Sequence, residues 1–241
     1  MPDLADVFES IMALNRWSGE ESRSGPGSTL IYTHNLRRQL IEFCAQFPVR
    51  TIGGPRKGHL HLDWVRCEAR LSAAQCARVI AIGRQFNREA PTVVGQEALA
   101  AHRVGHVYML PPDGPAEPIY QMLWDVAADA AARHYGILIS GITRMPHYVE
   151  YVARYGHFHW HNDYSHESEE SPRKLTVIIQ LSDSDEYEGG DLEIFNARPE
   201  PAPRERGTIV CLPSFVTHRV TPITRGVRRI VVAWIAGPRL R

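Results

Sequence analysis

The residues best suited to chemistry lie in the segment YGHFHWHNDYSHE, where potential metal ligands are densely spaced. These ligands are His157, His159, His161, Asp163 and His166. Such density indicates either a metal site or an accidental surface cluster. His161 and Asp163 are two positions apart, so on a β-strand their side chains would point to one face and converge on one ion. His157 and His159 alternate with Phe158 and Trp160, and we expect them to line a cavity or face solvent. His166 lies in a charged run and reads as a loop residue.

A third ligand must come from elsewhere in the chain. The only histidine after residue 166 is His218, in LPSFVTHRV, where a strand would leave a Pro-containing loop. His161, Asp163 and His218 together supply two imidazoles and one carboxylate. This facial triad leaves three adjacent coordination positions open, as an iron(II) oxygenase requires. Cupin-type zinc sites and plain surface histidines produce the same pattern, so the triad alone leaves those alternatives open.

A buried arginine is expected ten residues beyond His218. Arg228 stands at the start of an apolar run, RRIVVAWI, that is typical of a buried strand. A guanidinium inside a barrel needs a carboxylate partner, because an unpaired buried charge is costly. The far carboxylate of 2-oxoglutarate, bound through two parallel hydrogen bonds, would supply that partner. Arg229 is adjacent, but the spacing favours Arg228.

The elements that must position these residues are two helices followed by a series of strands. Ser72 and Gln75 form a capping-box pattern ahead of an amphipathic helix. A second helix is predicted from Pro118 to Gly136, where a left-handed cap suits glycine. Short β-branched or aromatic runs predict strands at residues 104–110, 147–155, 174–181, 191–195, 207–212, 217–220 and 228–235. This order indicates an α+β fold whose strands close into a sandwich or jelly roll.

Four segments resemble the iron(II)- and 2-oxoglutarate-dependent dioxygenases, specifically their prolyl 4-hydroxylase-like branch. The segments are LSAAQCARVIAIG, YGHFHWHND, LSDSDEYEGGDLEIF and LPSFVTHRVTPITRGVRR with its closing AWI. The resemblance covers about residues 68–237. It implies a double-stranded β-helix, a cupin-like jelly roll with supporting helices packed on one side. The metal-binding core would span about residues 144–237.

The resemblance also implies roles for individual residues. His161, Asp163 and His218 would be the iron ligands and catalytic centre, and Arg228 would bind 2-oxoglutarate. Tyr151, ten residues before His161, matches a tyrosine that contacts the cosubstrate. Gln180 matches a further polar contact. A single Gly156 stands where relatives often have two glycines, which is a departure that affects the placement of Tyr151.

The activity implied is hydroxylation of an aliphatic C–H bond, with 2-oxoglutarate and O2 converted to succinate and CO2. The substrate would be an amino acid, a peptidyl residue or a natural-product scaffold, and ascorbate would serve as reductant. Asp163 argues for hydroxylation, because halogenating relatives replace this carboxylate with a small residue. The alternative is a non-catalytic, cupin-like metal-binding or sensor module, which would bind a divalent ion without consuming 2-oxoglutarate.

Residues 1–62 differ from the rest. The segment NRWSGEESRSGPGST resembles the opening of a group of class I methyltransferases. The acidic, Gly-rich loop of that family is replaced here by TIGGPRKGHLH, and 60 residues are too few for a nucleotide-binding α/β domain. We therefore expect a helical N-terminal cap, with one amphipathic helix over residues 32–47, followed by a dioxygenase domain over residues 63–241. The apolar stripe of that helix needs a partner, either the barrel or a second subunit in a homo-oligomer.

The charge balance excludes other classes of partner. Lys plus Arg number 27 and Asp plus Glu number 27, so no net field attracts nucleic acid or a membrane surface. No stretch approaches the roughly 18 apolar residues of a membrane span, and the first ten residues lack the basic start of a secretory signal. The four cysteines show no CxxC spacing, as expected for reduced thiols. A cytoplasmic protein is the expectation.

Overall fold

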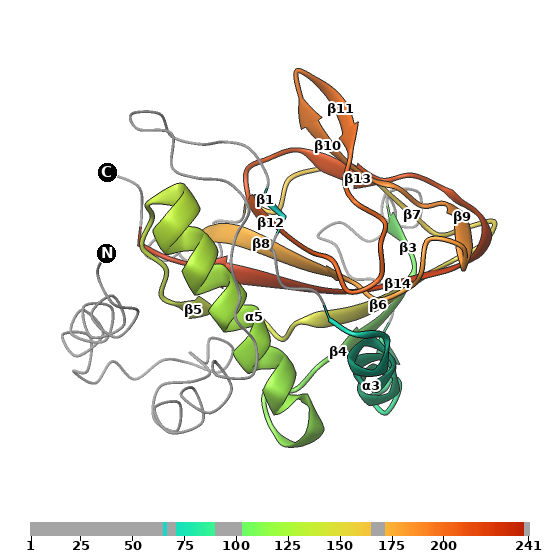
Figure 1. The fold of residues 1–241 in the computed structure, drawn as a ribbon, viewed down its shortest axis with the longest axis horizontal. Helices are drawn as coiled ribbons and strands as arrows, with labels where there is room; N and C mark the ends of the chain where they lie inside the picture. The colour runs from blue at the N-terminus through green and yellow to red at the C-terminus, as the bar shows by residue number, and fades with distance from the viewer. Residues whose placement is uncertain (1–64, 67–70, 90–102, 165–171, 239–241) are drawn as a thin grey trace. The chain divides into compact units, whose positions relative to one another are not determined.

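The computed structural model describes residues 65–66, 71–89, 103–164 and 172–238 (Figure 1). The predicted cap over residues 1–62, including the helix at 32–47, lies outside these described residues. None of the helices in the described part of the chain has the length and apolar content of a membrane span.

The described chain contains two α-helices, two short helical segments and fourteen strands. The helical elements are α3 (Ala73–Gly83), η2 (Gly114–Ala116), α5 (Glu117–Ala130) and η3 (Ala131–Tyr135). The strands are β1 (Val65–Arg66), β2 (Arg88–Glu89), β3 (Arg103–Val104), β4 (His106–Met109), β5 (Gly141–Ile142), β6 (His147–Val152), β7 (His157–His161), β8 (Arg173–Gln180), β9 (Tyr187–Gly189), β10 (Leu192–Asn196), β11 (Arg198–Pro201), β12 (Ile209–Pro213), β13 (His218–Val220) and β14 (Ile223–Ala236).

Both predicted helices form, and their ends follow local sequence signals. In α3 the Ser72 hydroxyl accepts the Gln75 backbone N–H, and the Gln75 side chain accepts the Ser72 N–H. This is the predicted capping box, which satisfies two N–H groups that the helix leaves without partners. The α-helical part of α5 ends at Ala130, and a π-helical turn carries the chain on to Gly136. Gly136 has φ of 62°, the left-handed cap predicted there.

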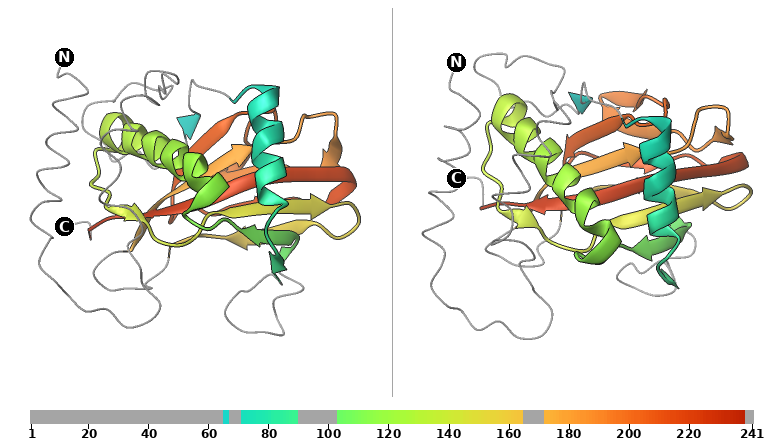
Figure 2. Two further views of the ribbon diagram at one scale, coloured as in Figure 1. Left: turned by 90° about the horizontal axis from the view of Figure 1, so that it is seen from below. Right: turned by 60° about the horizontal axis from the view of Figure 1, so that its bottom comes forward.

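The strands form two antiparallel sheets, as a double-stranded β-helix requires. The larger sheet has the order β1-β12-β8-β14-β6-β4-β2, with β5 and β9 also paired to β14. The smaller sheet has the order β11-β10-β13-β7-β3. Both α3 and α5 cover the same face of the larger sheet (Figure 2). The architecture is therefore the predicted α+β jelly roll with its helices on one side.

Two layers of apolar side chains separate these elements. The first packs the helices against the larger sheet and includes Leu123 and Val126 of α5 with Leu175 and Val177 of β8. The second lies between the two sheets and includes Tyr151 of β6 among its members. Alternate residues of each strand thus serve different layers, as the two-residue period of a strand requires. The second layer, called the inner layer below, lies around the predicted site.

Some strand predictions were wrong in their details. The single strand predicted at 104–110 is two strands, because the chain passes at Gly105 from β3 in the smaller sheet to β4 in the larger one. The strand predicted at 147–155 ends at Val152, where a turn places Arg154 at φ of 75°. The last strand begins at Ile223, well before the predicted start at 228.

One glycine anchors the start of α3 to the barrel and gives a stability prediction. Gly207 has φ of +80°, and a Cβ there would lie 1.9 Å from the Leu71 carbonyl oxygen. Gly207→Ala should therefore lower the free energy of unfolding by well over 2 kcal/mol, the sum of left-handed strain and a backbone clash. Gly114→Ala is the matched control, because Gly114 has φ of +63° but no atom within 4 Å of the added Cβ. Urea denaturation of both variants should show a loss of only about 1 kcal/mol for Gly114→Ala. Equal losses would contradict the packing argument.

Candidate metal centre

The three predicted metal ligands converge in the structure. One ligand atom from each of His161, Asp163 and His218 lies within 4.8 Å of the others. The Nε2 atom of His161 is 3.6 Å from Asp163 Oδ1, and Nε2 of His218 is 3.5 Å from Asp163 Oδ2. His161 ends β7 and His218 begins β13, and the two residues are cross-strand partners in the smaller sheet. The pairing of two strands far apart in sequence therefore builds the cluster.

Backbone carbonyls orient both imidazoles. His161 Nδ1–H donates to the carbonyl oxygen of His159 at 2.7 Å, and His218 Nδ1–H donates to that of Val216 at 3.0 Å. A proton held on Nδ1 leaves the Nε2 lone pair free on the side that faces Asp163. Hydrogen bonds of this kind, made by the ring nitrogen that does not bind the metal, fix the tautomer of metal-ligating histidines. The two rings are thus arranged as a metal would need them.

Asp163 differs from its predicted setting, because it lies beyond the end of β7 and not on the strand. Its backbone N–H donates to the Ser214 carbonyl oxygen at 2.8 Å, which fixes the loop. The Thr176 hydroxyl donates to Asp163 Oδ2 at 2.8 Å and lies 3.2 Å from the Ser214 hydroxyl. Contacts with β8 and with the segment after β12, and not a place on a strand, therefore hold Asp163 in position. They aim the carboxylate at the two imidazoles.

The protonation states favour a cation. Burial, with His218 beside it, lowers the pKa of His161 to about 4, so this imidazole is neutral at neutral pH. Burial alone would raise the pKa of the Asp163 carboxyl, but His218, His161 and the Thr176 hydroxyl hold that pKa below its ordinary value. An ionised carboxylate beside a neutral imidazole is the ligand form that a divalent metal binds.

Thr176 and Ser214 were not identified from the sequence as parts of the site. A signal existed for Thr176, because it stands four residues before Gln180 on β8 and so shares the inner face of that strand. Ser214 gave no such signal, since its role depends on the antiparallel pairing of β12 with β8.

Thr176→Val should weaken metal binding without unfolding the protein. The change keeps the branched shape but removes the hydroxyl that donates to Asp163. Loss of such a hydrogen bond to a metal ligand lowers metal affinity by roughly 10- to 100-fold. Competition with a chelator of known affinity would measure this loss. Thr143→Val is a suitable control, because its hydroxyl donates to the Trp234 carbonyl outside the ligand cluster. Equal affinity in the two variants would show that Thr176 does not position the carboxylate.

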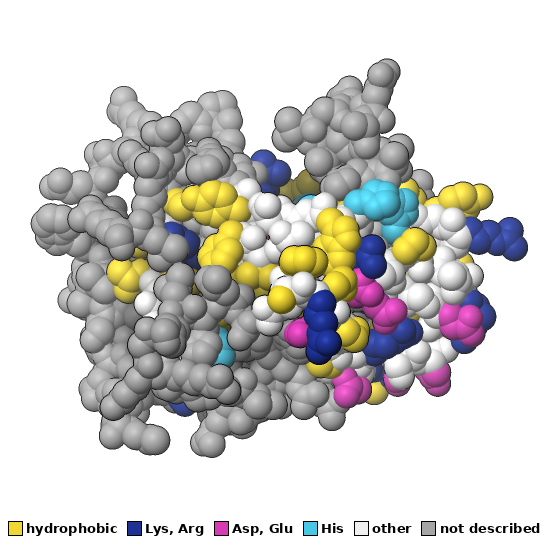
Figure 3. Space-filling model, turned by 90° about the horizontal axis from the view of Figure 1, so that it is seen from above, with side chains coloured by type: hydrophobic (Ala, Val, Ile, Leu, Met, Phe, Trp, Pro, Cys, Tyr) yellow, Lys and Arg dark blue, Asp and Glu magenta, His cyan; other side chains and the backbone are white. Residues whose placement is uncertain are grey.

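The other histidines of the segment do not join the cluster. His157 and His159 lie on β7 with their rings 4.7 Å apart, and His159 is exposed. One face of the molecule carries histidine side chains beside hydrophobic ones (Figure 3). His166 lies outside the described residues.

Arg228 lies inside the barrel and Arg229 on the other face of β14. Arg228 is 3% exposed, donates from Nε to Gln180 Oε1 at 3.0 Å, and has no partner for Nη1. Within the described ranges no carboxylate pairs with it. Arg229 instead forms ion pairs with Glu186 at 2.9 Å and Glu150 at 3.4 Å. Of these two arginines, Arg228 is therefore the one whose charge faces the interior without a described carboxylate partner.

Tyr151 and Gln180 both lie beside this arginine. Tyr151 is the cross-strand partner of Arg228 between β6 and β14, and it is buried. Gln180 is buried on β8, where its Nε2 donates to the Ser182 carbonyl oxygen and the Tyr187 hydroxyl, both at 3.1 Å. These two bonds fix the Gln180 amide so that its oxygen faces Arg228. The structure thus places all six predicted site residues in the inner layer or directly next to it.

The residues present fit a metal ion and a dicarboxylate. Two imidazoles and one carboxylate are a suitable donor set for Fe(II) with open positions. The orphaned Nη1 of Arg228 is a buried cationic donor, and a ligand carboxylate would remove the cost of leaving it unpaired.

The sequence comparisons agree with this site. Residues 146–236 match the 2OG-Fe(II) oxygenase superfamily. A PKHD-type hydroxylase of Synechococcus sp. (strain CC9311) is 40% identical over 62 residues, which cover 25% of this chain and 28% of that protein. Another, from Teredinibacter turnerae, is 44% identical over 62 residues, or 25% and 27% of the two chains. The matched region is thus about a quarter of the length of these relatives.

The solved structures agree in fold. A prolyl-4-hydroxylase of Pseudomonas putida superimposes with a TM-score of 0.57 at 14% identity, over 84% of this chain and 98% of that one. A prolyl hydroxylase of Trichoplax adhaerens, solved with a hypoxia inducible factor peptide fragment, gives 0.56 at 13% identity, over 81% and 86%. Residues 146–236 therefore resemble the 2OG-Fe(II) oxygenase superfamily, and the chain has the fold of the solved prolyl hydroxylases.

Proposed function

We propose that this protein is an Fe(II)- and 2-oxoglutarate-dependent dioxygenase that hydroxylates an aliphatic C–H bond of a small molecule or a peptidyl residue. The observation that carries the proposal is the presence of two features in one barrel. One is the His161, Asp163 and His218 cluster, and the other is the buried Arg228 with an unused donor. A protein that bound only a metal would have no need for the second feature.

Each residue has a role in the proposed reaction. His161, Asp163 and His218 would hold Fe(II) on one side and leave the other side open to ligands. Arg228, held by Gln180, would bind the far carboxylate of 2-oxoglutarate, and Tyr151 would contact the same cosubstrate. When bound, Fe(II) and 2-oxoglutarate together would activate O2 for attack on a C–H bond. The apolar inner layer excludes water from this space.

The test is formation of succinate from 2-oxoglutarate by the purified protein in air with Fe(II), with and without a chelator. We expect metal-dependent succinate formation even without the true substrate, because bound Fe(II), 2-oxoglutarate and O2 would still react slowly when no substrate is present. Binding of Fe(II) with no succinate under any condition would instead support the alternative of a non-catalytic, cupin-like metal-binding module. Stimulation of succinate formation by added ascorbate would test the predicted reductant.

A further inference from the structure

A second buried arginine lies beside the metal cluster and has no role in the account above. Arg103 is on β3, at the edge of the smaller sheet, and is only 6% exposed. Its Nε has no hydrogen-bond partner, and no carboxylate in the described part of the chain pairs with its guanidinium. A buried guanidinium without a carboxylate partner is costly.

Stacking contacts connect this arginine to a metal ligand. Arg103 is the cross-strand partner of Phe158 on β7, and its Cζ lies 4.9 Å from the centroid of the Phe158 ring. That ring in turn stacks on His161, with the centroids 3.5 Å apart and the planes 18° from parallel. One aromatic ring therefore separates the guanidinium from the metal ligand. A cation–π contact offsets part of the cost of burial but leaves the N–H donors unused.

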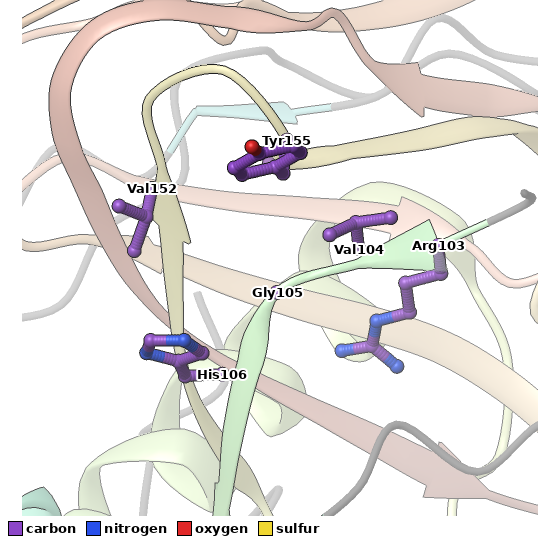
Figure 4. Close-up of a pocket in the computed structure, with 7 residues that line it drawn as sticks. Arg103, Val104, Gly105, His106, Val152 and Tyr155 are labelled. Atoms are coloured by element: carbon purple, nitrogen blue, oxygen red, sulfur yellow. The ribbon is translucent and has the colours of Figure 1, made fainter. Parts of the chain in front are cut away.

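The space beside Arg103 can take a ligand. Arg103 helps to line a cavity of about 340 Å³ at the junction between β3 and β4. The turn after β6 forms the opposite side of this cavity. The other lining residues of the cavity are Val104, Gly105, His106, Val152, Tyr155 and Gly156, and the exposed wall is largely apolar (Figure 4). The Arg103 and Val104 side chains lie on opposite sides of β3 (Figure 4). A small, mostly apolar cavity with one cation suits a small organic anion.

A positive field surrounds this side of the cluster. Arg173 lies with Cζ 4.6 Å from the Trp234 ring centroid and donates to the Asp163 carbonyl oxygen at 3.4 Å. His147 packs edge-on against the same Trp234 ring. Burial, with Arg103, Arg173 and Arg144 around it, lowers the pKa of His147 to about 3, so His147 adds no charge of its own. The arginines thus act together on one region.

We propose that Arg103 is the specificity-determining residue of this enzyme, and that it binds a carboxylate of the substrate beside the metal centre. This rests on the proposed function and adds a substrate class to it: acids, with the carboxylate free in a small molecule or carried on a peptide side chain. A guanidinium with planar, forked donors is well suited to bind a carboxylate. It is distinct from Arg228, which is on β14 and serves the cosubstrate.

The test compares matched acids and amides as probes. Protein loaded with Fe(II) and 2-oxoglutarate without oxygen is titrated with a panel of N-acetyl amino acids and with the corresponding amides. A second arm uses capped, amidated hexapeptides that carry Glu or Gln at the same position. We expect at least one arm to show acids bound about tenfold or more tighter than amides, as a charge-assisted hydrogen bond provides. The arm that shows it distinguishes a free acid from a peptide side chain.

Variants connect that preference to Arg103. Arg103→Gln removes the charge but keeps an unbranched polar side chain, and it should reduce the preference for acids to about onefold. Arg103→Lys keeps the charge and should retain part of it. Arg198→Gln, an exposed change of equal charge on β11, should retain all of it. In every variant 2-oxoglutarate should bind within about twofold of the original affinity, since Arg228 is intact.

Two results would overturn the inference. One is the absence of any preference for acids in both arms, and the other is a preference that persists in Arg103→Gln. A purely structural Arg103, which only supports Phe158, would change overall affinity but not the ratio between acids and amides. Failure of the proposed function would look different, because it would abolish succinate formation in the original protein. The binding ratio alone decides the role of Arg103.

Discussion

Replacement of His161 or His218 by alanine should remove iron from the purified protein. Each imidazole has Nε2 facing Asp163, with its Nδ1 proton held by a backbone carbonyl. Removing the group that hydrogen-bonds to a metal ligand lowers metal affinity by roughly 10- to 100-fold, so removing the ligand itself should lower it by more than about 100-fold. Iron content per chain, measured after dialysis against a weak chelator, should fall from near one to near zero.

The control is His159→Ala. His159 lies on the same strand, is exposed and stands outside the ligand cluster. Only its carbonyl oxygen contacts His161, and alanine keeps that group. Full iron content in His159→Ala with none in His161→Ala would assign the metal to the cluster. Full iron content in both His161→Ala and His218→Ala would remove the site from this account, provided that thermal unfolding shows both variants folded.

The parts of the site that could be predicted are those with a local signal. The two-residue separation of His161 and Asp163 is visible in the sequence, and so is the apolar run that follows Arg228. The inner placement of Gln180 follows from the two-residue period of β8. Capping boxes and glycine caps act within one turn of helix, so the start of α3 and the glycine cap at Gly136 were also accessible.

The parts that could not be predicted depend on pairing between distant segments. Ser214 reaches Asp163 only because β12 lies against β8. Arg103 reaches Phe158 only because the short strand β3 pairs with β7. Strands of three or four residues, such as β9 and β11, carry too few alternating positions to be recognised. Asp163 was placed on a strand for the same reason, since the end of β7 is set by its neighbours and not by its own residues.

The second large effect is expected at Arg228. Arg228→Ala removes a buried cation that no described carboxylate pairs with, and 2-oxoglutarate would lose its far contact. Truncating one partner of a buried charge pair costs roughly 2 to 5 kcal/mol, or tens to thousands of fold in affinity. Titration of 2-oxoglutarate into the iron-loaded protein, followed by the absorption of the iron chelate, would measure this loss. Arg229→Ala is the matched control, because Arg229 is already paired with Glu186 and Glu150.

A further variant separates charge recognition from a general loss of packing. Gln180→Glu places a carboxylate where the Gln180 Oε1 accepts from Arg228 Nε at 3.0 Å, so Arg228 would gain an internal partner. The side chain keeps its size, yet a second carboxylate would now be repelled and would meet a neutralised cation. We therefore expect Gln180→Glu to weaken 2-oxoglutarate binding nearly as much as Arg228→Ala does, while iron binding stays intact. If Gln180→Glu binds 2-oxoglutarate normally, the far carboxylate does not bind at Arg228, and another cation must hold it.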